Sequence, residues 1–380
     1  MEAHKAKQGT PFPRDDPRHQ QRERAGETPV LALNGESGSW DSRTPPYPPT
    51  DRPVQVPGFS PMSPSEPEAQ CRKTAKHAYS RLGIGMLIFM LGQLVFPALL
   101  SFLINALFPG ATQNAILRFM ITYGSMYLLG LPLMRLFLKG LPDAPPPMLQ
   151  GERMRLQTVL TLFPVLYAVT IAVNLLGSQL ERLLGKEVTV TTGELLETGM
   201  PIWLLGVMSL LIAPVMEELV FRRMTYQKAA GYGAMPYIIW SSIAFGLFHL
   251  NFTQTLYAAA LGLFLAVVML RTGSVRYSIL LHLMVNATGF LGTLASVNTD
   301  LSNPQAELPV LMGVFGLLMM VLLVAGLVLG ISLLNRLLRW HRQSPNRRQP
   351  VRLRDAVCNP GSILYGAVCM AVMVGLAVMQ

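Results

Sequence analysis

Long runs of apolar residues recur from about Leu82 to the end of the chain, with few polar positions inside them. Runs of about 20 residues are long enough to cross a ~30 Å hydrocarbon core as helices. Stretches such as Leu311 to Leu334 are apolar on every face, which is not the alternating pattern of a membrane β-strand. The pattern therefore predicts an all-α fold, a polytopic transmembrane helical bundle of eight or nine spans. The predicted helices cover residues 83–108, 114–138, 156–180, 201–226, 235–252, 254–270, 276–297, 308–335 and 361–379.

The segments outside the apolar runs complete the predicted organisation. Residues 1–75 are rich in proline, serine and glycine and contain too little apolar surface to offset the entropy of ordering, so we expect a disordered tail. A proline-rich ligand for a partner domain is the alternative for this tail. The bundle is expected over 80–335, with its intramembrane polar groups concentrated at 200–290. A basic loop over 336–360 and a last transmembrane helix over 361–380 follow.

Composition agrees with a membrane protein, because 51% of the residues are hydrophobic and only 14% are charged, whereas a soluble domain has roughly 25% charged residues. The net charge of +10 does not indicate nucleic-acid binding, since the basic residues gather beside the ends of apolar runs rather than on one compact surface. This is the positive-inside pattern, which predicts a cytoplasmic N-terminus for the tail and a cytoplasmic 336–360 loop. The basic residues beside the earlier runs are Arg72, Lys73, Lys76, Arg81, Arg135, Lys139, Arg222, Arg223, Lys228, Arg271 and Arg276.

Very few polar groups lie inside the central spans. Between Pro201 and Asn298 the only acids are Glu217 and Glu218, and the only histidines are His249 and His282. A carboxylate near the bilayer centre costs on the order of 2.5 to 3.5 kcal/mol on insertion scales, so two adjacent ones indicate a function.

The helical period places the two adjacent acids on different faces of the helix. Glu218 and Arg222 are four residues apart and share a face, so the arginine can neutralise this glutamate. Glu217 is rotated by about 100° and is left to face another helix, in a dry setting that suits it to take a proton from water. The alternative is that both acids form one ion-pair knot that only fixes the packing.

Two further pairs have the same four-residue spacing: Phe245 with His249, and His282 with Asn286. A lone histidine in an apolar helix is usually a hydrogen-bonded packing residue. Two histidines that both follow a pair of glutamates instead favour a functional site. Counting back from the cytoplasmic helix ends at ~1.5 Å per residue places Glu217 and these polar side chains in one layer, about 9 to 20 Å deep.

These motifs together resemble the CPBP family, the CAAX-protease and bacteriocin-processing membrane peptidases that include abortive-infection-type proteins. The family is marked by Glu-Glu-x-x-x-Arg, Phe-x-x-x-His and His-x-x-x-Asn on successive helices. The corresponding residues here are Glu217, Glu218 and Arg222, then Phe245 and His249, then His282 and Asn286. The resemblance covers 200–290, which it makes the peptidase core of a glutamate-dependent intramembrane endopeptidase.

The resemblance also implies a role for each of these residues. Glu217 would activate a water with help from His249, while His282 and Asn286 would hold the oxyanion. The remaining motif residues, Glu218, Arg222 and Phe245, would support the site. No cofactor is implied. One departure is Thr253, where some CAAX-type members have an asparagine four residues after the second-motif histidine, and whether Asn251 substitutes is left open.

Three alternatives to this mechanism remain at this point. Glu217, His249 and His282 are a plausible zinc set, although the chain lacks a His-Glu-x-x-His helix. Intramembrane acids and histidines also form the proton relays of transporters. A non-catalytic membrane scaffold is the third. The expected partners are the lipid bilayer and a peptide or protein substrate at the membrane, a prenylated or leader peptide, and no nucleic acid. A bacterial plasma membrane is expected from the resemblance, and the oligomeric state is left open.

Overall fold

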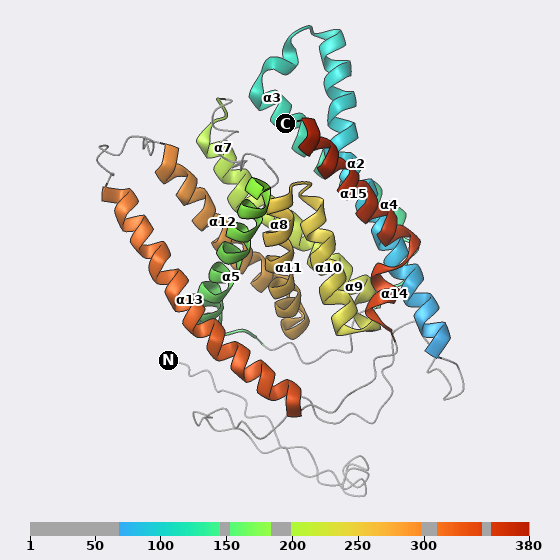
Figure 1. Cartoon of the computed structure of the whole chain (residues 1–380). Coiled ribbons are helices and arrows are strands. Elements are labelled where there is room, and N and C mark those ends of the chain that lie inside the picture. The colour runs from blue at the N-terminus through green and yellow to red at the C-terminus, as the bar shows by residue number, and fades with distance from the viewer. Residues whose placement is uncertain (1–67, 145–152, 184–198, 298–309, 344–350, 380) are drawn as a thin grey trace, which may run out of the picture. The chain divides into compact units, whose positions relative to one another are not determined.

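The structure is a computed structural model that describes residues 68–144, 153–183, 199–297, 310–343 and 351–379. Helices make up almost all of these residues (Figure 1). Seven of the described helices are long and apolar enough to cross a membrane, and two shorter apolar helices accompany them. Each of the nine predicted helices coincides with one of these stretches. The prediction of an all-α transmembrane bundle is confirmed.

The described elements run in the following order along the chain. They are α2 (Glu68–Leu107), η1 (Ala111–Gln113), α3 (Ala115–Gly124), η2 (Ser125–Gly130), α4 (Leu131–Leu138), α5 (Leu156–Leu183), α7 (Ile202–Val207), η3 (Met208–Ile212), α8 (Ala213–Glu217), η4 (Glu218–Met224), α9 (Thr225–Ala229), η5 (Ala230–Tyr232), α10 (Ala234–Phe248), α11 (Phe252–Thr272), α12 (Val275–Val297), α13 (Val310–Gln343), α14 (Leu353–Val357) and α15 (Pro360–Met379).

The first helix begins earlier than its apolar run. α2 starts at Glu68, so residues 68–75, assigned to the tail from the sequence, are helical, and the rest of the predicted tail lies outside the described residues. Ala75, Ala78 and Leu82 are buried, with the three- and four-residue spacing of one helix face. That face packs on the bundle although the opposite face is charged, which a search for continuous apolar runs cannot detect.

The last part of the chain also differs from its predicted boundaries. α13 continues to Gln343, beyond the predicted end at residue 335. The predicted 336–360 loop contains the short helix α14, and its residues 344–350 lie outside the described part.

Glycines allow the long helices to cross closely. A Cβ at Gly361 on α15 would overlap the carbonyl group of Ser80 on α2, and a Cβ at Gly326 on α13 would overlap that of Pro164 on α5. Membrane helices have no hydrophobic driving force toward one another, so they associate through close contacts of this kind at small residues. These two crossings join the last two long helices of the chain to its earlier part.

The helices that carry the polar residues pack against one another. α10 lies along α11, and α12 contacts α11, η3, α8 and η4. α5 packs against α11 and α13, while α2 packs against α15 and α4. The motifs on α8, η4, α10 and α12 therefore come from neighbouring helices.

Basic side chains of α2 and α9 meet the end of α4 and the segment after it at one end of the bundle; we call it the basic end. Here the loop after α4 joins α9, because Lys228 Nζ lies 2.6 Å from the carbonyl oxygen of Leu141 and 2.8 Å from the Asp143 carboxylate. Arg81 on α2 donates a hydrogen bond to the carbonyl of Phe137 at the end of α4. The grouping of the other basic residues and its cytoplasmic orientation stay predictions.

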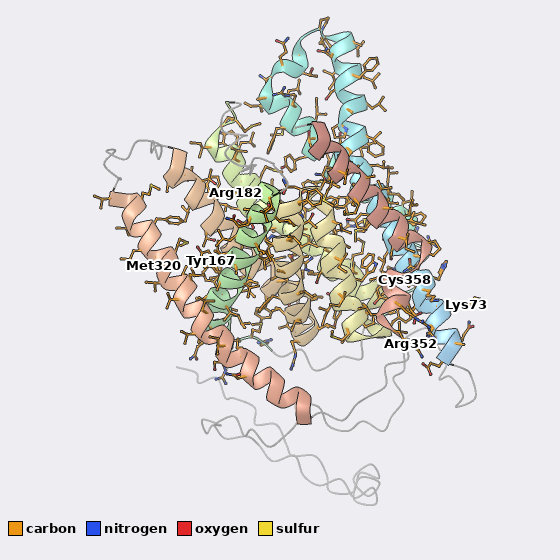
Figure 2. All side chains as sticks on the ribbon, viewed as in Figure 1. Lys73, Tyr167, Arg182, Met320, Arg352 and Cys358 are labelled. Carbon is orange, nitrogen blue, oxygen red and sulfur yellow. The ribbon has the colours of Figure 1, made fainter. Side chains whose placement is uncertain are left out.

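A buried carboxylate fastens α14 to α2 at this end. The Asp355 side chain is fully buried, and Arg72 donates to both of its oxygens, over 2.8 and 3.0 Å. Lys76 lies 3.5 Å away, and the backbone N–H of Arg352 donates over 3.0 Å. Figure 2 shows Lys73 and Arg352 together at this end. The hydrogen bond from Arg72 is the main cause that lowers the pKa of Asp355 to about 2.

We predict that Asp355→Asn destabilises the protein at pH 7 by roughly 2 kcal/mol, the equivalent of its lowered pKa. Because the folded pKa lies below the ordinary value of 3.8, this stabilisation is complete above pH ~4 and is lost as the pH falls toward about 2. Thermal unfolding in detergent measures both effects. The matched control is Asp143→Asn, since Asp143 is 65% exposed and its ion pair should contribute little. Equal losses in the two variants would contradict a special role for Asp355.

Candidate active site

The helix that carries both glutamates is interrupted by two wide turns. Its stretch Ile202–Tyr232 contains the π-helical segments η3 and η4, with the short α8 between them. In a π turn an N–H bonds a carbonyl five residues back, and such turns are frequent at functional sites. Glu217 ends α8 and Glu218 begins η4. The two acids therefore lie where the helix changes its winding.

Pro214 leaves one carbonyl of this helix in need of a donor. The N–H of Ala213 bonds the Met208 carbonyl, and the next bond in that pattern would join residue 214 to the carbonyl of Ser209. Proline has no N–H, so this bond cannot form. Asn286 on α12 supplies a donor, with its Nδ2 2.9 Å from the Ser209 oxygen. Because an unpaired carbonyl is costly in a lipid-shielded helix, Asn286 fastens α12 to the broken helix.

The contact between Asn286 and Ser209 was not predicted, because the motif assigned the Asn286 amide to the oxyanion alone. The available signal was the proline itself, placed five residues after Ser209 within an apolar helix. The Asn286 amide carries two N–H bonds, and the contact with Ser209 uses one of them. The other has no partner among the described residues.

The second glutamate is held from two sides. Glu218 and Arg222 are both completely buried, and the Arg222 Nε lies 3.3 Å from Glu218 Oε2. This contact lacks the alignment of a hydrogen bond, so it is mainly an electrostatic attraction between opposite charges. On the other side, His282 Nδ1 lies 3.0 Å from Glu218 Oε1. The pairing of Glu218 with Arg222 predicted from the four-residue spacing is present.

The first glutamate contacts the same imidazole. His282 Nε2 lies 3.6 Å from Glu217 Oε2, and the Glu217 side chain is 17% exposed. His282 itself is buried, so its ring stands between the two carboxylates, with one nitrogen toward each. As predicted, Glu217 faces another helix, and that helix is α12.

The cluster combines two carboxylates with one guanidinium and one imidazole. The 3.0 Å contact between His282 Nδ1 and Glu218 Oε1 is a hydrogen bond, whereas the 3.6 Å contact between His282 Nε2 and Glu217 Oε2 is too long for one. Buried charges are tolerated when they are paired in this way.

Phe245 on α10 connects this cluster to the second histidine. Its ring lies edge-on to His249 at 4.9 Å and to His282 at 5.7 Å between ring centres. The Arg222 guanidinium carbon lies 4.3 Å from the centre of the same ring, a cation–π contact. Phe245 is completely buried, so it holds three polar groups in place without competing for their hydrogen bonds.

His249 is the C-cap residue that follows α10. One of its ring nitrogens is hydrogen-bonded to the backbone, and the other is available. Its Nδ1 lies 2.9 Å from the carbonyl oxygen of Phe245, which can only accept, so Nδ1 carries the ring proton of the neutral imidazole. Nε2 is then an acceptor. His249 is linked to Glu217 through a chain of contacts, because Phe245 touches both imidazole rings and His282 touches Glu217.

Asn251, considered above as a substitute for the CAAX-type asparagine, is the N-cap residue of α11. Its side-chain oxygen accepts from the Gln254 N–H over 2.9 Å and caps the start of α11. Glu181 binds the same first turn of α11, since the Thr253 N–H donates to Glu181 Oε1 over 3.1 Å. The Asn251 oxygen therefore caps the helix, and Thr253 is buried.

The zinc alternative can be compared with these positions. Among the described residues, no group of three or more histidine, cysteine, aspartate or glutamate side chains is arranged to hold a metal ion. Glu218 also engages one of the two nitrogens of His282. The proposed zinc set of Glu217, His249 and His282 therefore does not form a ligand cluster in this structure.

The contact between Asn286 and Ser209 predicts a stability effect that depends on Pro214. Asn286→Ala should destabilise the protein by roughly 1 to 3 kcal/mol, because the Ser209 carbonyl loses its donor. In a Pro214→Ala background residue 214 regains an N–H that can bond this carbonyl, so the same change should cost clearly less. Thermal unfolding of the four proteins in detergent measures the difference. Equal losses in both backgrounds would disprove the link between Pro214 and Asn286.

Comparison with known proteins identifies the region that holds this cluster. A family model described as type II CAAX prenyl endopeptidase Rce1-like matches residues 199–288. Searches of curated proteins and of solved structures each gave no match. The matched range begins just before the broken helix, ends within α12 and includes both glutamates and both histidines of the site. The chain thus contains a domain of the Rce1-like type II CAAX prenyl endopeptidase family, a family of intramembrane peptide-bond hydrolases.

Proposed function

We propose that this protein hydrolyses a peptide bond of a membrane-associated substrate, a prenylated or leader peptide, with a water activated by Glu217. The main support is the contact between Glu217 and His282 inside a buried polar cluster, within the stretch that matches the endopeptidase family. A partly exposed carboxylate beside buried polar groups is a suitable base for water in a water-poor site.

In the first step, the water oxygen attacks the carbonyl carbon of the scissile bond while Glu217 takes one water proton. The acceptor nitrogen Nε2 of His249 orients the water by accepting a hydrogen bond from its second hydrogen. Glu217 then passes the proton to the nitrogen of the leaving peptide, and the C–N bond breaks. No proton is left over, because the one taken from water leaves with the new amine.

The oxyanion formed in the first step needs donors. Once Glu217 has accepted a proton, its attraction for His282 weakens, and the 3.6 Å contact is the looser of the two that this ring makes. In its imidazolium form, His282 can then donate its Nε2–H to the oxyanion without moving the ring, together with the second N–H of Asn286. Donors of this kind contribute several kcal/mol in a water-poor site. Glu218 and Arg222 keep the ring in place throughout.

The location of the reaction follows from the basic end of the bundle. The positive-inside rule favours a cytoplasmic basic end, with Glu217 nearer to that side than to the other. Within this proposal the substrate comes from the cytoplasmic side of the membrane. The assignment to a bacterial plasma membrane also stays a prediction.

The transporter and scaffold alternatives make opposite predictions for a single assay. A proton relay needs Glu217 and His282 for proton flux and cleaves no peptide. A scaffold would bind without cleaving and would tolerate changes at Glu217. Cleavage by the purified protein in vesicles, together with its loss in variants, therefore separates the three functions.

We expect Glu217→Gln to lower the cleavage rate of a membrane-anchored peptide about 10³-fold or more, and His249→Ala by roughly 10²-fold, since both remove groups that act on the water. The assay uses the full chain in lipid vesicles. The matched controls are Glu68→Gln and His77→Ala, which change exposed residues on α2. Undiminished cleavage by both site variants would remove the catalytic assignment.

Treatment with a metal chelator in the same assay tests the zinc alternative. The water activated by Glu217 needs no metal, so we expect the cleavage rate to stay within about twofold after chelation. The measured quantity is the initial rate before and after dialysis against chelator. Loss of activity that zinc restores would show that the mechanism depends on a metal.

A further inference from the structure

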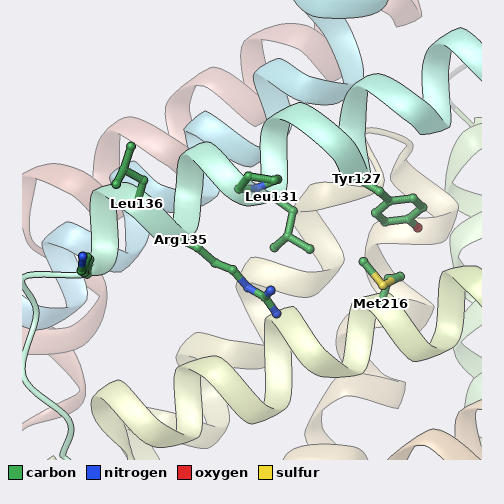
Figure 3. A pocket seen from close by; sticks show the side chains of 7 residues that line it. Tyr127, Leu131, Arg135, Leu136 and Met216 are labelled. Carbon is green, nitrogen blue, oxygen red and sulfur yellow. The ribbon is translucent and has the colours of Figure 1, made fainter.

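An open groove of about 610 Å³ lies beside the candidate active site, between η2–α4 and α8. Its walls include Tyr127, Leu131 and Lys139 on one side and Met216 on the other. Figure 3 shows Arg135 extended from α4 across the groove toward the helix that carries Met216. The groove is therefore mostly apolar but has cationic side chains at one end.

The residues on the η2–α4 side form a stripe with regular spacing. Tyr127, Leu131, Arg135 and Lys139 are each four residues apart, so they lie along one face of the helix. At ~1.5 Å per residue, Tyr127 and Arg135 are separated by about 12 Å along the axis. The stripe thus runs from an aromatic residue at one end to two cations at the other.

The aromatic end of the stripe adjoins the candidate active site. Met216, which lines the groove, directly precedes Glu217 in the chain, and Tyr127 lines the same groove. The Tyr127 hydroxyl is buried and has no hydrogen-bond partner within the described ranges. A hydroxyl in this state, in a groove that reaches the residue before Glu217, is suited to bind a polar group of a substrate.

The cationic end is free to bind an anion. Arg135 and Lys139 are exposed, and the described part of the chain shows no hydrogen bond or ion pair from the Arg135 guanidinium. A guanidinium can hold a carboxylate with two parallel hydrogen bonds, so arginine is better suited than lysine to recognise a carboxylate.

We propose that Arg135 binds the C-terminal carboxylate of the peptide substrate, with Lys139 adding positive charge. This inference rests on the proposed function. The distance along the stripe from Tyr127 to Arg135 is close to the ~10 Å span of three extended residues, so the carboxylate would lie about three residues beyond the scissile bond. The wall between them includes Leu131, so it favours apolar side chains in this part of the peptide. Arg135 then determines which peptides are cleaved, and Glu217 cleaves them.

The alternative occupant of the cationic end is the anionic headgroup of a phospholipid. A headgroup would need no fixed distance from Glu217, whereas a substrate carboxylate does. The position of the groove directly beside Met216 favours the substrate.

The test compares one S-farnesylated peptide, with three residues after the modified cysteine, as a free acid and as a C-terminal amide. In neutral vesicles, wild type should cleave the acid with a kcat/KM at least about tenfold above that of the amide, mainly through KM, as expected for a charge-assisted contact. Arg135→Gln should cleave both peptides as poorly as wild type cleaves the amide, and Arg135→Lys should recover part of the difference. Arg118→Gln, which changes an exposed arginine on α3, is the matched control.

Each other outcome contradicts a stated part of the proposal. Equal cleavage of acid and amide by wild type would overturn the carboxylate site but leave the peptidase intact, and this comparison needs no variant to fold. The same conclusion follows if Arg135→Gln still prefers the acid. If Arg135 matters only when anionic lipid is added, the cationic end binds a headgroup instead. Cleavage of neither peptide by wild type would overturn the peptidase proposal and this inference with it.

Discussion

The His282 imidazole between two glutamates is the interaction on which the rest of the site depends. Inside a bilayer, two adjacent carboxylates are tolerated only if cations and protons balance them. Arg222 supplies a positive charge beside Glu218, and the His282 ring contacts both carboxylates. The same arrangement that makes the acids tolerable also leaves Glu217 partly exposed and loosely held, which is the condition for a base that must exchange a proton with water.

Backbone geometry brings these groups together. The π turns on both sides of α8 set the direction of Glu217 and Glu218, and Pro214 frees the Ser209 carbonyl that Asn286 then binds. α12 is thereby attached to the broken helix at two levels, through His282 and through Asn286. Phe245 adds α10 to the same contact. Stability and the proposed catalysis therefore involve overlapping residues, and the two effects have to be measured separately.

Much of this could be predicted from the sequence, because membrane helices are defined by run length and their faces by four-residue spacing. The nine helices and the shared face of Glu218 and Arg222 follow from those rules. Other features depend on contacts between distant segments. The start of α2 depends on a buried face of small residues around Ala75, and the partners of His282 and Tyr127 depend on how the helices are rotated against one another. The roles assigned to the site residues in the reaction stay predictions.

The most direct test of the central claim is an experimental density map of the full chain in lipid nanodiscs that resolves the side chains around α12. The account predicts the His282 ring between the carboxylates of Glu217 and Glu218, with Phe245 against it. A map in which Glu217 points into lipid, and His282 packs against neither glutamate, would contradict it.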